Sequence, residues 1–254
     1  MPGALFAHGN SGLNIRNGKA LVSEIDKQIS SAIFGNGGKD KEELGDGVYK
    51  QFGIGKEGFH ISSCQFALHY FFENEKSLHS FLRNLSECTR VNGYFIGTCY
   101  DGMKLYQTLM NQESEHITME DDMGIKVYDI HKKYEIESFD YDKDNLSNMF
   151  GNTVDVYMSS IGQYIEEYLV NFEFFIDIMK EYGFTLQEPT SLKKKNTFLK
   201  GPIGNFDDII DNLDSVKEDR SFKKHYRDSL EVARIKEYKR LSGLNNWFIF
   251  KKTK

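Results

Sequence analysis

The sequence predicts an α/β fold organised around a mostly parallel β-sheet, and three consecutive stretches carry this prediction. Residues 59–64 have the composition of a buried strand, and residues 94–100 form a second stretch rich in aromatic and β-branched side chains. Between them, residues 77–90 place apolar side chains at i, i+3, i+4 and i+7, which is typical of a helix with one buried face. A strand, a helix and a second strand at this spacing form a βαβ unit, whose two strands lie parallel.

The elements around this unit are shorter and less regular. Residues 4–7 are predicted to form a strand, and apolar side chains at near-helical spacing predict a helix over residues 19–34. Residues 35–58 are rich in glycine and are expected to form a surface loop. Residues 91–93 end in a glycine and predict a turn before the second strand. A helix is expected to follow that strand at residues 103–111.

The second half of the chain predicts antiparallel additions to the sheet. Residues 125–140 alternate in the manner of a hairpin or an insertion, which we place over residues 120–145. Residues 166–182 carry an aromatic stripe on one face and are expected to form a helix whose stripe belongs to the core. The remaining predicted elements are a strand at residues 150–161, helices at 206–213 and 229–240, and a closing strand at 246–251.

The composition indicates one folded domain without a membrane segment. The chain has 254 residues, of which 39% are hydrophobic and 14% aromatic, enough for one sizeable core. The net charge of −6 argues against a broad surface that binds polyanions, although a local basic pocket is compatible with it. Lysine clusters at residues 193–195, 223–224 and 251–254 are interpreted as solvated surface. No stretch approaches the ~20 apolar residues of a membrane span, and no signal-peptide pattern is present.

Common site motifs are absent or misplaced. The glycines from Gly53 to Gly58 have the spacing of a dinucleotide fingerprint, but phosphate binding needs a strand before them and a helix after them. Here a loop precedes them and a strand follows, so we reject that interpretation. No G-x-S-x-G elbow occurs. The cysteines form no CxxC pair and have no histidine at zinc-ligand spacing, so no metal site is expected and the thiols are interpreted as reduced.

The segment from residue 63 to residue 73 is the most informative part of the sequence. It follows a buried strand, at the end of the sheet where open α/β folds bind ligands. It combines Gln65 and His69 with aromatic side chains, and buried amide and imidazole groups need polar partners, which a ligand supplies. From the residues alone, a binding site and an aromatic core cluster are equally well supported.

Residues 65–73, Gln-Phe-Ala-Leu-His-Tyr-Phe-Phe-Glu, resemble the signature of eukaryotic and giant-virus mRNA cap guanine-N7 methyltransferases. The resemblance continues on both sides of this signature and in the family's order. Residues 14–18 and 33–37 resemble the viral branch, and residues 93–102 and 167–172 resemble the segments that follow the signature. Most of the chain is therefore covered by the resemblance.

The resemblance implies a fold, a donor and a partner. The family has a class I methyltransferase fold, which is Rossmann-like, and moves a methyl group from S-adenosylmethionine to N7 of the cap guanine. The implied partner is the 5′ end of capped RNA (GpppN), with other capping-enzyme domains or subunits as further partners and with no metal and no membrane. The protein is expected in the cytoplasm, in a viral factory, if its source is a virus, and in the nucleus if its source is cellular.

The resemblance also assigns a cap-binding pocket. Glu167 matches the carboxylate that accepts hydrogen bonds from guanine N1–H and N2–H, and its expected position at a helix start favours the charged form. Tyr157 matches an aromatic side chain that packs on the guanine. The other residues implied for the pocket are Phe66, His69, Tyr70, Tyr100 and Trp247.

The donor site implied by the resemblance has two parts. Gln65 and Phe66 fall at the boundary between donor and cap, while Asn10 and Ser11 fall where relatives carry Asp-Ser to bind the donor's adenine. An amide oxygen still accepts that bond but carries no charge, so weaker donor affinity is expected. No catalytic residue is expected, because guanine N7 carries a free lone pair and requires alignment rather than a base.

The front part of the family's donor site has no counterpart before Ala4. The sequence therefore predicts a single partial methyltransferase domain over residues 1–254, which lacks its first strands and by itself binds the donor poorly. Three explanations are open. The chain is a fragment or a mis-started reading frame of a longer capping enzyme, which we favour, or a catalytically inactive cap-binding or accessory subunit, or an enzyme whose missing strands come from a partner chain.

Overall fold

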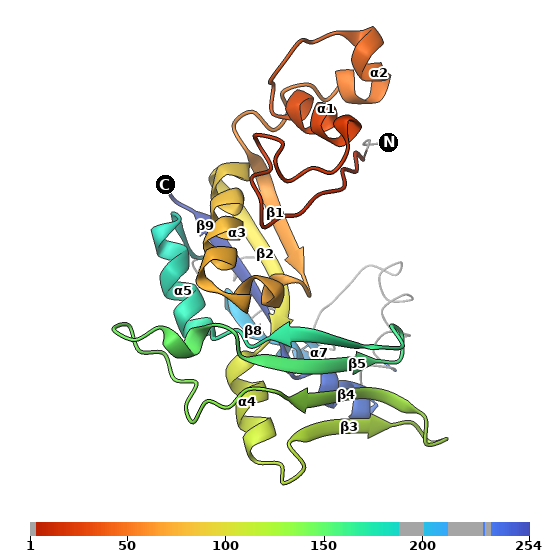
Figure 1. Cartoon of the computed structure of the whole chain (residues 1–254), viewed down its shortest axis with the longest axis vertical. Coiled ribbons are helices and arrows are strands. Elements are labelled where there is room, and N and C mark those ends of the chain that lie inside the picture. Colours follow the sequence, from red (N-terminus) through yellow and green to blue (C-terminus); the bar gives the residue numbers. More distant parts are fainter. Residues whose placement is uncertain (1–3, 188–200, 213–230, 232–234) are drawn as a thin grey trace.

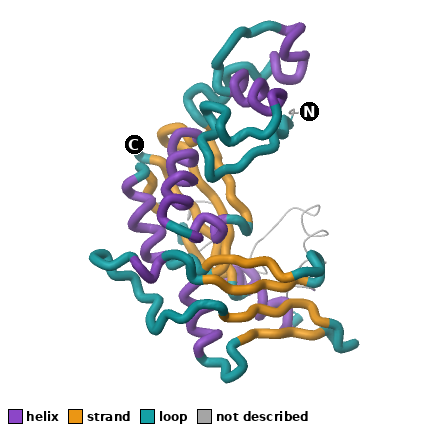
Figure 2. The backbone as a smooth tube through the Cα atoms, viewed as in Figure 1, coloured by secondary structure: helices purple, strands orange, loops and turns teal. Residues whose placement is uncertain are grey.

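The structure, a computed structural model, describes residues 4–187, 201–212, 231 and 235–254 (Figure 1). It contains two β-sheets, with helices against the larger one and an N-terminal segment beyond the end of that sheet (Figure 2). The α/β class predicted from the sequence is confirmed. The lysine clusters at residues 193–195 and 223–224 lie outside the described residues, as do residues 229–230 and 232–234 of the helix predicted at 229–240.

The larger sheet has the strand order β1-β2-β9-β7, with β8 also paired to β9. Strands β1 and β2 are parallel, as the βαβ interpretation predicted, while β9 runs antiparallel to β2, β7 and β8. The expectation of a mostly parallel sheet is therefore wrong for the described strands, because the closing strand enters antiparallel to its neighbours. The bounds of these strands are β1 Phe59–Gln65, β2 Thr89–Tyr100, β7 Phe184–Leu186, β8 Ile203–Asn205 and β9 Asn245–Lys252.

The smaller sheet is an antiparallel meander in the order β3-β4-β5-β6. Its strands are β3 His116–Glu120, β4 Lys126–Lys132, β5 Thr153–Met158 and β6 Tyr164–Tyr168. The predicted hairpin around residues 125–140 is formed by β3 and β4, somewhat earlier in the chain, and the predicted strand at 150–161 contains β5. The antiparallel additions expected after the βαβ unit are therefore present.

The helix predicted over residues 166–182 is wrong in its first part. Residues 164–168 form β6, and helix α5 covers only Phe172–Glu181. Asn171 sets this start, because its side-chain oxygen accepts a hydrogen bond from the backbone N–H of Phe174 at 3.1 Å. The aromatic stripe belongs to both elements, and Glu167 consequently lies on a strand instead of at a helix start.

The helices predicted at residues 77–90, 103–111 and 206–213 correspond to helices of the main body. Helix α3, Glu75–Cys88, is capped by Asn74, whose side chain accepts from the backbone N–H of Ser77 at 2.9 Å. It packs against β1 and β2, as a crossover helix of a parallel pair must. The remaining elements are the 3₁₀ helices η1 Leu68–Glu73 and η2 Ser147–Met149 and the α-helices α4 Gly102–Met110, α7 Phe206–Asn212 and α9 Lys236–Ser242.

The N-terminal segment differs most from its prediction. Residues 4–7 form no strand, and the only β-pairing of the described residues before α1 is an isolated bridge between Gly9 and Leu21. Helix α1 spans Glu24–Ile33, inside the predicted range, but the expected loop at 35–58 contains a further helix, α2 Lys41–Tyr49. Asp40 begins that helix by accepting from two backbone N–H groups, a capping signal that the glycine content obscured.

Asn84 of α3 attaches this segment to the main body. Its side-chain oxygen accepts from the backbone N–H of Ile15 at 3.0 Å, and its amide nitrogen donates to the carbonyl oxygens of Ser11, at 2.7 Å, and Leu13. Asn84 is only 3% exposed, so these bonds replace those that water would otherwise make.

The turn predicted at residues 91–93 lies inside β2. The register between β1 and β2 shifts there, and the residue with positive φ is Asn92, at 64°, instead of Gly93. Gly93 is required for space, because a Cβ at that position would lie 2.8 Å from the carbonyl oxygen of Arg90. The irregularity allows the chain to leave α3 and enter the sheet without a separate loop.

Strand β1 has a neighbouring strand on one side only within the described ranges. Strand β2 pairs with it there, and no described strand pairs with its other edge. Ile61 in the middle of β1 is 58% exposed, which is unusual for a parallel strand, since such strands are normally covered on both faces. No helix in the described ranges combines the length and the apolar character that crossing a bilayer requires.

Candidate functional site

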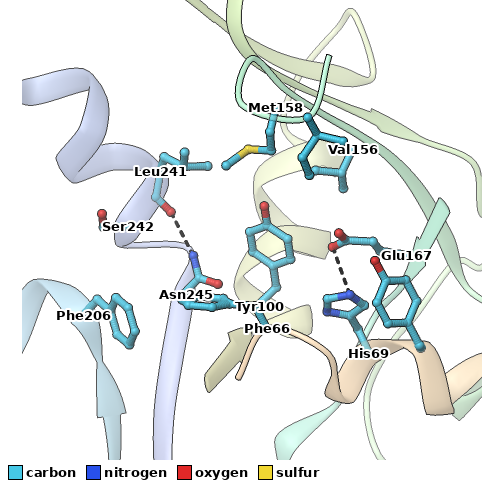
Figure 3. Close-up of a pocket in the computed structure, with 12 residues that line it drawn as sticks. Phe66, His69, Tyr100, Val156, Met158, Glu167, Phe206, Leu241, Ser242 and Asn245 are labelled. Carbon is cyan, nitrogen blue, oxygen red and sulfur yellow. Dashed lines mark hydrogen bonds and ion pairs between the residues drawn. The ribbon is translucent and has the colours of Figure 1, made fainter. Parts of the chain in front are cut away.

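A cavity of about 310 Å³ lies where the end of β1 and of β2 meets the inner face of the smaller sheet. Figure 3 shows Glu167 and His69 on one side of it and Phe206 on the opposite side. The cavity is mainly aromatic and aliphatic, with a small number of polar side chains, as is usual for small-molecule sites. Its lining consists of Phe66, His69, Tyr70, Tyr100, Val156, Met158, Ile161, Glu167, Phe206, Leu241, Ser242 and Asn245.

A left-handed residue at the end of β1 brings the signature segment into this cavity. Phe66 has φ of 50°, a conformation that costs a residue with a side chain about 1–2 kcal/mol. The chain then turns into η1, whose Leu68, His69 and Phe72 are buried. Phe66 itself is 53% exposed, and its ring meets that of Phe206 edge to face at 6.1 Å between centroids. Strain of this kind is concentrated at functional sites.

The pleat of β6 directs Glu167 into the cavity and Glu166 to the opposite face. Glu167 is paired with Val154 of β5, a core residue, whereas Glu166 is exposed and accepts a hydrogen bond from the hydroxyl of Tyr168. Oε2 of Glu167 lies 3.6 Å from Nε2 of His69. Neither that oxygen nor either ring nitrogen of His69 has a hydrogen-bond partner among the described residues.

Burial sets the protonation of both groups. The side chains of His69 and Glu167 are 3% and 12% exposed. Desolvation lowers the pKa of His69 to about 4 and raises the pKa of Glu167 to about 7. At neutral pH the imidazole is therefore uncharged and the contact is not a pair of full opposite charges. The expectation that a helix start favours the charged carboxylate is wrong, because Glu167 lies on a strand and loses hydration there.

Two tyrosines complete the polar end of the cavity. The ring of Tyr70 lies 4.2 Å from the ring of His69 between centroids, and the ring of Tyr100 lies 6.5 Å from it. Burial raises the pKa of both phenols, and the negative charge of the nearby Glu167 adds a smaller increase. Both hydroxyls therefore remain protonated and available as donors. The site thus combines a carboxyl acceptor, phenol donors and flat rings within one cavity.

The structure brings Phe66, His69, Tyr70, Tyr100 and Glu167 together at this cavity. Tyr157 and Trp247, assigned to the same pocket from the sequence, do not line it.

Tyr157 alternates with Val156 and Met158 along β5 and so faces the outer side of the smaller sheet, where its ring lies 5.4 Å from that of Tyr164. Trp247 is 7% exposed and its indole packs on Gly204 of β8, so that strand covers it.

The wall opposite Glu167 was missed in the sequence analysis. It consists of Phe206, Leu241, Ser242 and Asn245 from the last part of the chain. The pairing of β9 with β2 and two polar side-chain contacts hold this wall in place. The side chain of Asn246 donates to Asp101 at 2.9 Å, and the side chain of Asn205 donates to the carbonyl oxygen of Gly243 at 2.7 Å. The adjacent asparagines at 245–246 give little indication of a binding site in the sequence. Only the fold shows that one lines the cavity and that the other bonds to Asp101.

The residues assigned to the donor are more scattered. Ser11 lines a second cavity of about 250 Å³ on the α3 side of β1, together with Ser63 and Cys64. Asn10 does not line it, and its side-chain oxygen accepts from the backbone N–H of Gly12 at 2.8 Å. Gln65 lines neither cavity.

S-adenosylmethionine carries a sulfonium, an ammonium and ribose hydroxyls, which acidic side chains normally bind. No described acidic side chain lines the second cavity, whose polar groups are hydroxyls, thiols and the Asn84 amide. The described lining of this cavity therefore lacks the acidic group with which such a donor is normally bound. Among the described residues, no group of three or more His, Cys, Asp or Glu side chains is arranged to hold a metal ion.

Comparison with known proteins matches residues 23–247 to the family of the mRNA (guanine-N(7))-methyltransferase domain. The chain is 29% identical over 205 residues to a probable mRNA-capping enzyme of Acanthamoeba polyphaga mimivirus, covering 75% of this chain and 17% of that protein. It is 28% identical over 138 residues to the mRNA cap guanine-N(7) methyltransferase of Drosophila melanogaster, covering 54% of this chain and 28% of that protein.

Among solved structures, an S-adenosylmethionine-dependent methyltransferase from Clostridium acetobutylicum matches with a TM-score of 0.38 and 13% identity, covering 77% of this chain and 58% of that one. The chain spans less than a third of the length of the mimivirus and Drosophila relatives. The family match nevertheless covers most of the chain and includes every residue that lines the first cavity. The chain belongs to the mRNA (guanine-N(7))-methyltransferase domain family.

Proposed function

We propose that the first cavity binds the guanine of capped RNA, and that the complete enzyme to which this chain contributes methylates that guanine at N7. The observation that carries the proposal is the carboxyl of Glu167, which is directed into an aromatic cavity and has one oxygen without a hydrogen-bond partner among the described residues. A buried acceptor of this kind is costly unless a ligand supplies donors.

Guanine has the complementary chemistry. Its Watson–Crick edge presents two parallel donors, N1–H and N2–H, to which a carboxylate binds in a bidentate manner. Adenine presents an acceptor at N1 and has no equivalent pair. The rings of Phe66, Tyr70 and Tyr100 supply apolar contact area, and stacking contributes roughly 1–3 kcal/mol per base. The preference for guanine would therefore come from Glu167 and the affinity from the rings.

This chain's contribution to the reaction is binding and orientation. Guanine N7 is a nucleophile with a free lone pair, so no side chain has to remove a proton from it. Holding a nucleophile in the correct direction can lower a barrier by about 7–11 kcal/mol. The methyl group comes from S-adenosylmethionine in this family, and the described residues hold at most part of that donor. We expect weak donor binding by this chain alone and propose that further protein, on the same chain or on a partner, completes the site.

Calorimetric titration with unmethylated cap analogues tests the proposal. We expect GpppG to bind and ApppA not to bind, with an intermediate affinity for an analogue whose guanine lacks the 2-amino group. Glu167→Gln should reduce GpppG affinity by about thirtyfold or more, because an amide cannot accept two donors in parallel. Glu166→Gln is the matched control, since that neighbour faces outward. Equal binding of GpppG and ApppA, or equal loss in both variants, would contradict the proposal.

The same proposal places the protein where capped transcripts are made. For a virus that is the cytoplasmic viral factory, and for a cell it is the nucleus. Other capping-enzyme domains or subunits are proposed as partners, and co-purification from the source with full-length capping proteins would test this.

A further inference from the structure

One hydroxyl group on β2 contacts both residues at the end of β1. Oγ1 of Thr98 lies 3.2 Å from the backbone nitrogen of Phe66, from which it accepts a hydrogen bond. The same Oγ1 donates to Oε1 of Gln65 at 2.9 Å. The carbonyl oxygen of Thr98 also accepts from the N–H of Phe66, at 2.9 Å. Thr98 therefore holds two consecutive residues, one of which lines the cavity.

The contacts form a directional chain that leaves little freedom. The Thr98 hydroxyl has one proton, which is given to Gln65, so its lone pairs are free to accept from Phe66. The amide nitrogen of Gln65 in turn donates to Oγ of Ser63 at 2.9 Å. Gln65 is consequently fixed at both ends of its amide group, although its side chain is exposed.

Phe66 needs such an anchor. Its φ of 50° is disfavoured for a residue with a bulky side chain, so the surrounding contacts must select it. The left-handed turn places its ring in the cavity opposite Phe206, and it directs the chain into η1, which carries His69 and Tyr70. A change of φ at this position would move the ring and both polar residues together.

We propose that Thr98 is a positioning residue of the cap site, whose hydroxyl fixes the backbone of Phe66 and the amide of Gln65 before the guanine binds. The inference rests on the proposed function for the identity of the ligand. A role in the strand alone would require only a β-branched side chain, which valine supplies, whereas positioning requires the hydroxyl.

Three substitutions separate these roles. Thr98→Val keeps the shape and removes the hydroxyl, Thr98→Ser keeps the hydroxyl, and Thr98→Ala is a second variant without it, should valine impair folding. Thr118→Val is the matched control, because Thr118 is a strand threonine on the smaller sheet whose hydroxyl makes a long, 3.5 Å contact with the carbonyl oxygen of Tyr128. Thermal unfolding establishes that each variant is folded.

The first measurement needs no ligand. Amide hydrogen exchange at Phe66 is expected to become about fivefold faster in Thr98→Val and Thr98→Ala, and to stay unchanged in Thr98→Ser and Thr118→Val. Unchanged exchange in both variants without the hydroxyl would overturn the inference even if the wild-type chain binds the cap.

The second measurement is calorimetric titration with GpppG. Affinity is expected to fall about fivefold in Thr98→Val and Thr98→Ala, and to be restored in Thr98→Ser. Equal affinity in all variants would overturn the positioning role and leave the proposed function intact. Failure of the wild-type chain to bind GpppG would overturn both, and it is recognised by the absence of binding before any substitution.

Discussion

Nε2 of His69 lies 3.6 Å from Oε2 of Glu167 inside the cavity, and burial favours the neutral form of each group. The pKa of the imidazole is lowered to about 4 and the pKa of the carboxyl is raised to about 7. The site is thus close to uncharged without a ligand, and a base that offers two donors would favour the ionised carboxylate. Guanine binding is therefore expected to be accompanied by proton release.

Cap affinity should depend on pH through Glu167. The ionised carboxylate accepts both guanine donors, and its population rises as pH increases through its pKa of about 7. GpppG affinity is expected to be about thirtyfold higher at about pH 8.5 than at about pH 5.5. The pKa of His69, about 4, keeps that group neutral over this range. Titration calorimetry across the range measures the profile, and Glu167→Gln should flatten it; an equally steep profile in that variant would exclude Glu167 as its source.

The same carboxyl should make the fold less stable as pH rises from about 4.5 to about 7. The folded chain keeps the proton of Glu167 up to about pH 7, whereas the unfolded chain releases it near 4.5. Stability is therefore lost as pH rises through this window, by about 3 kcal/mol at most for a group this deeply buried. Urea unfolding should show Glu167→Gln gaining stability over the wild type between about pH 5 and about pH 8. The exposed Glu166→Gln variant should show no such gain, and a gain in both would point to general charge repulsion.

The wall that the sequence analysis missed should contribute to binding. Phe206→Ala removes a ring from the cavity and is expected to weaken GpppG binding by about 1–2 kcal/mol, or about five- to thirtyfold. Tyr157→Ala, on the outer face of the smaller sheet, should leave the affinity within about twofold of the wild type. Titration of the two variants side by side decides which of the two residues contributes to the binding site. A loss of affinity confined to Tyr157→Ala would favour the assignment of Tyr157 from the family resemblance over the position that the structure gives it.

Gly97 of β2 is packed so closely against β1 and β9 that no side chain should be tolerated at this position. A Cβ at Gly97 would lie 2.5 Å from the carbonyl oxygen of Cys64 and would overlap the ring of Phe248. Gly97→Ala is expected to reduce the free energy of unfolding by about 1–3 kcal/mol. Gly38→Ala is the control, because no atom of the described residues lies within 4 Å of a Cβ there. Urea unfolding measures both, and equal stabilities would mean that β1 and β2 lie farther apart than described.

The central part of the fold was predictable because local pattern and tertiary contact agree there. The apolar residues of β1, α3 and β2 are spaced as their buried faces require. The parallel pairing of β1 and β2 follows from the helical crossover between them. Phe66, His69 and Tyr70 were assigned to the pocket from the family resemblance, and they line the cavity at the end of β1. From the residues alone, a core cluster was equally well supported.

The errors came from signals that only tertiary structure resolves. Residues 164–168 carry the same aromatic stripe as α5, and pairing with β5 makes them a strand. Residues 4–7 read as a strand but pair with no described strand, and a strand is not stable without a ladder. Phe206 and Asn245 are distant from the signature in sequence and reach the cavity only because β8 and β9 join the larger sheet.

The edge of β1 that pairs with no described strand has a consequence for handling the protein. The seven residues Phe59–Gln65 contain no lysine and no proline, the residues with which natural sheets usually discourage pairing between molecules. Backbone N–H and C=O groups that pair with no described strand, beside the exposed Ile61, offer a template for a foreign backbone. Concentrated stocks of this chain should therefore tend to form oligomers and precipitate, and a lysine introduced at position 61 would be a reasonable solubilising change.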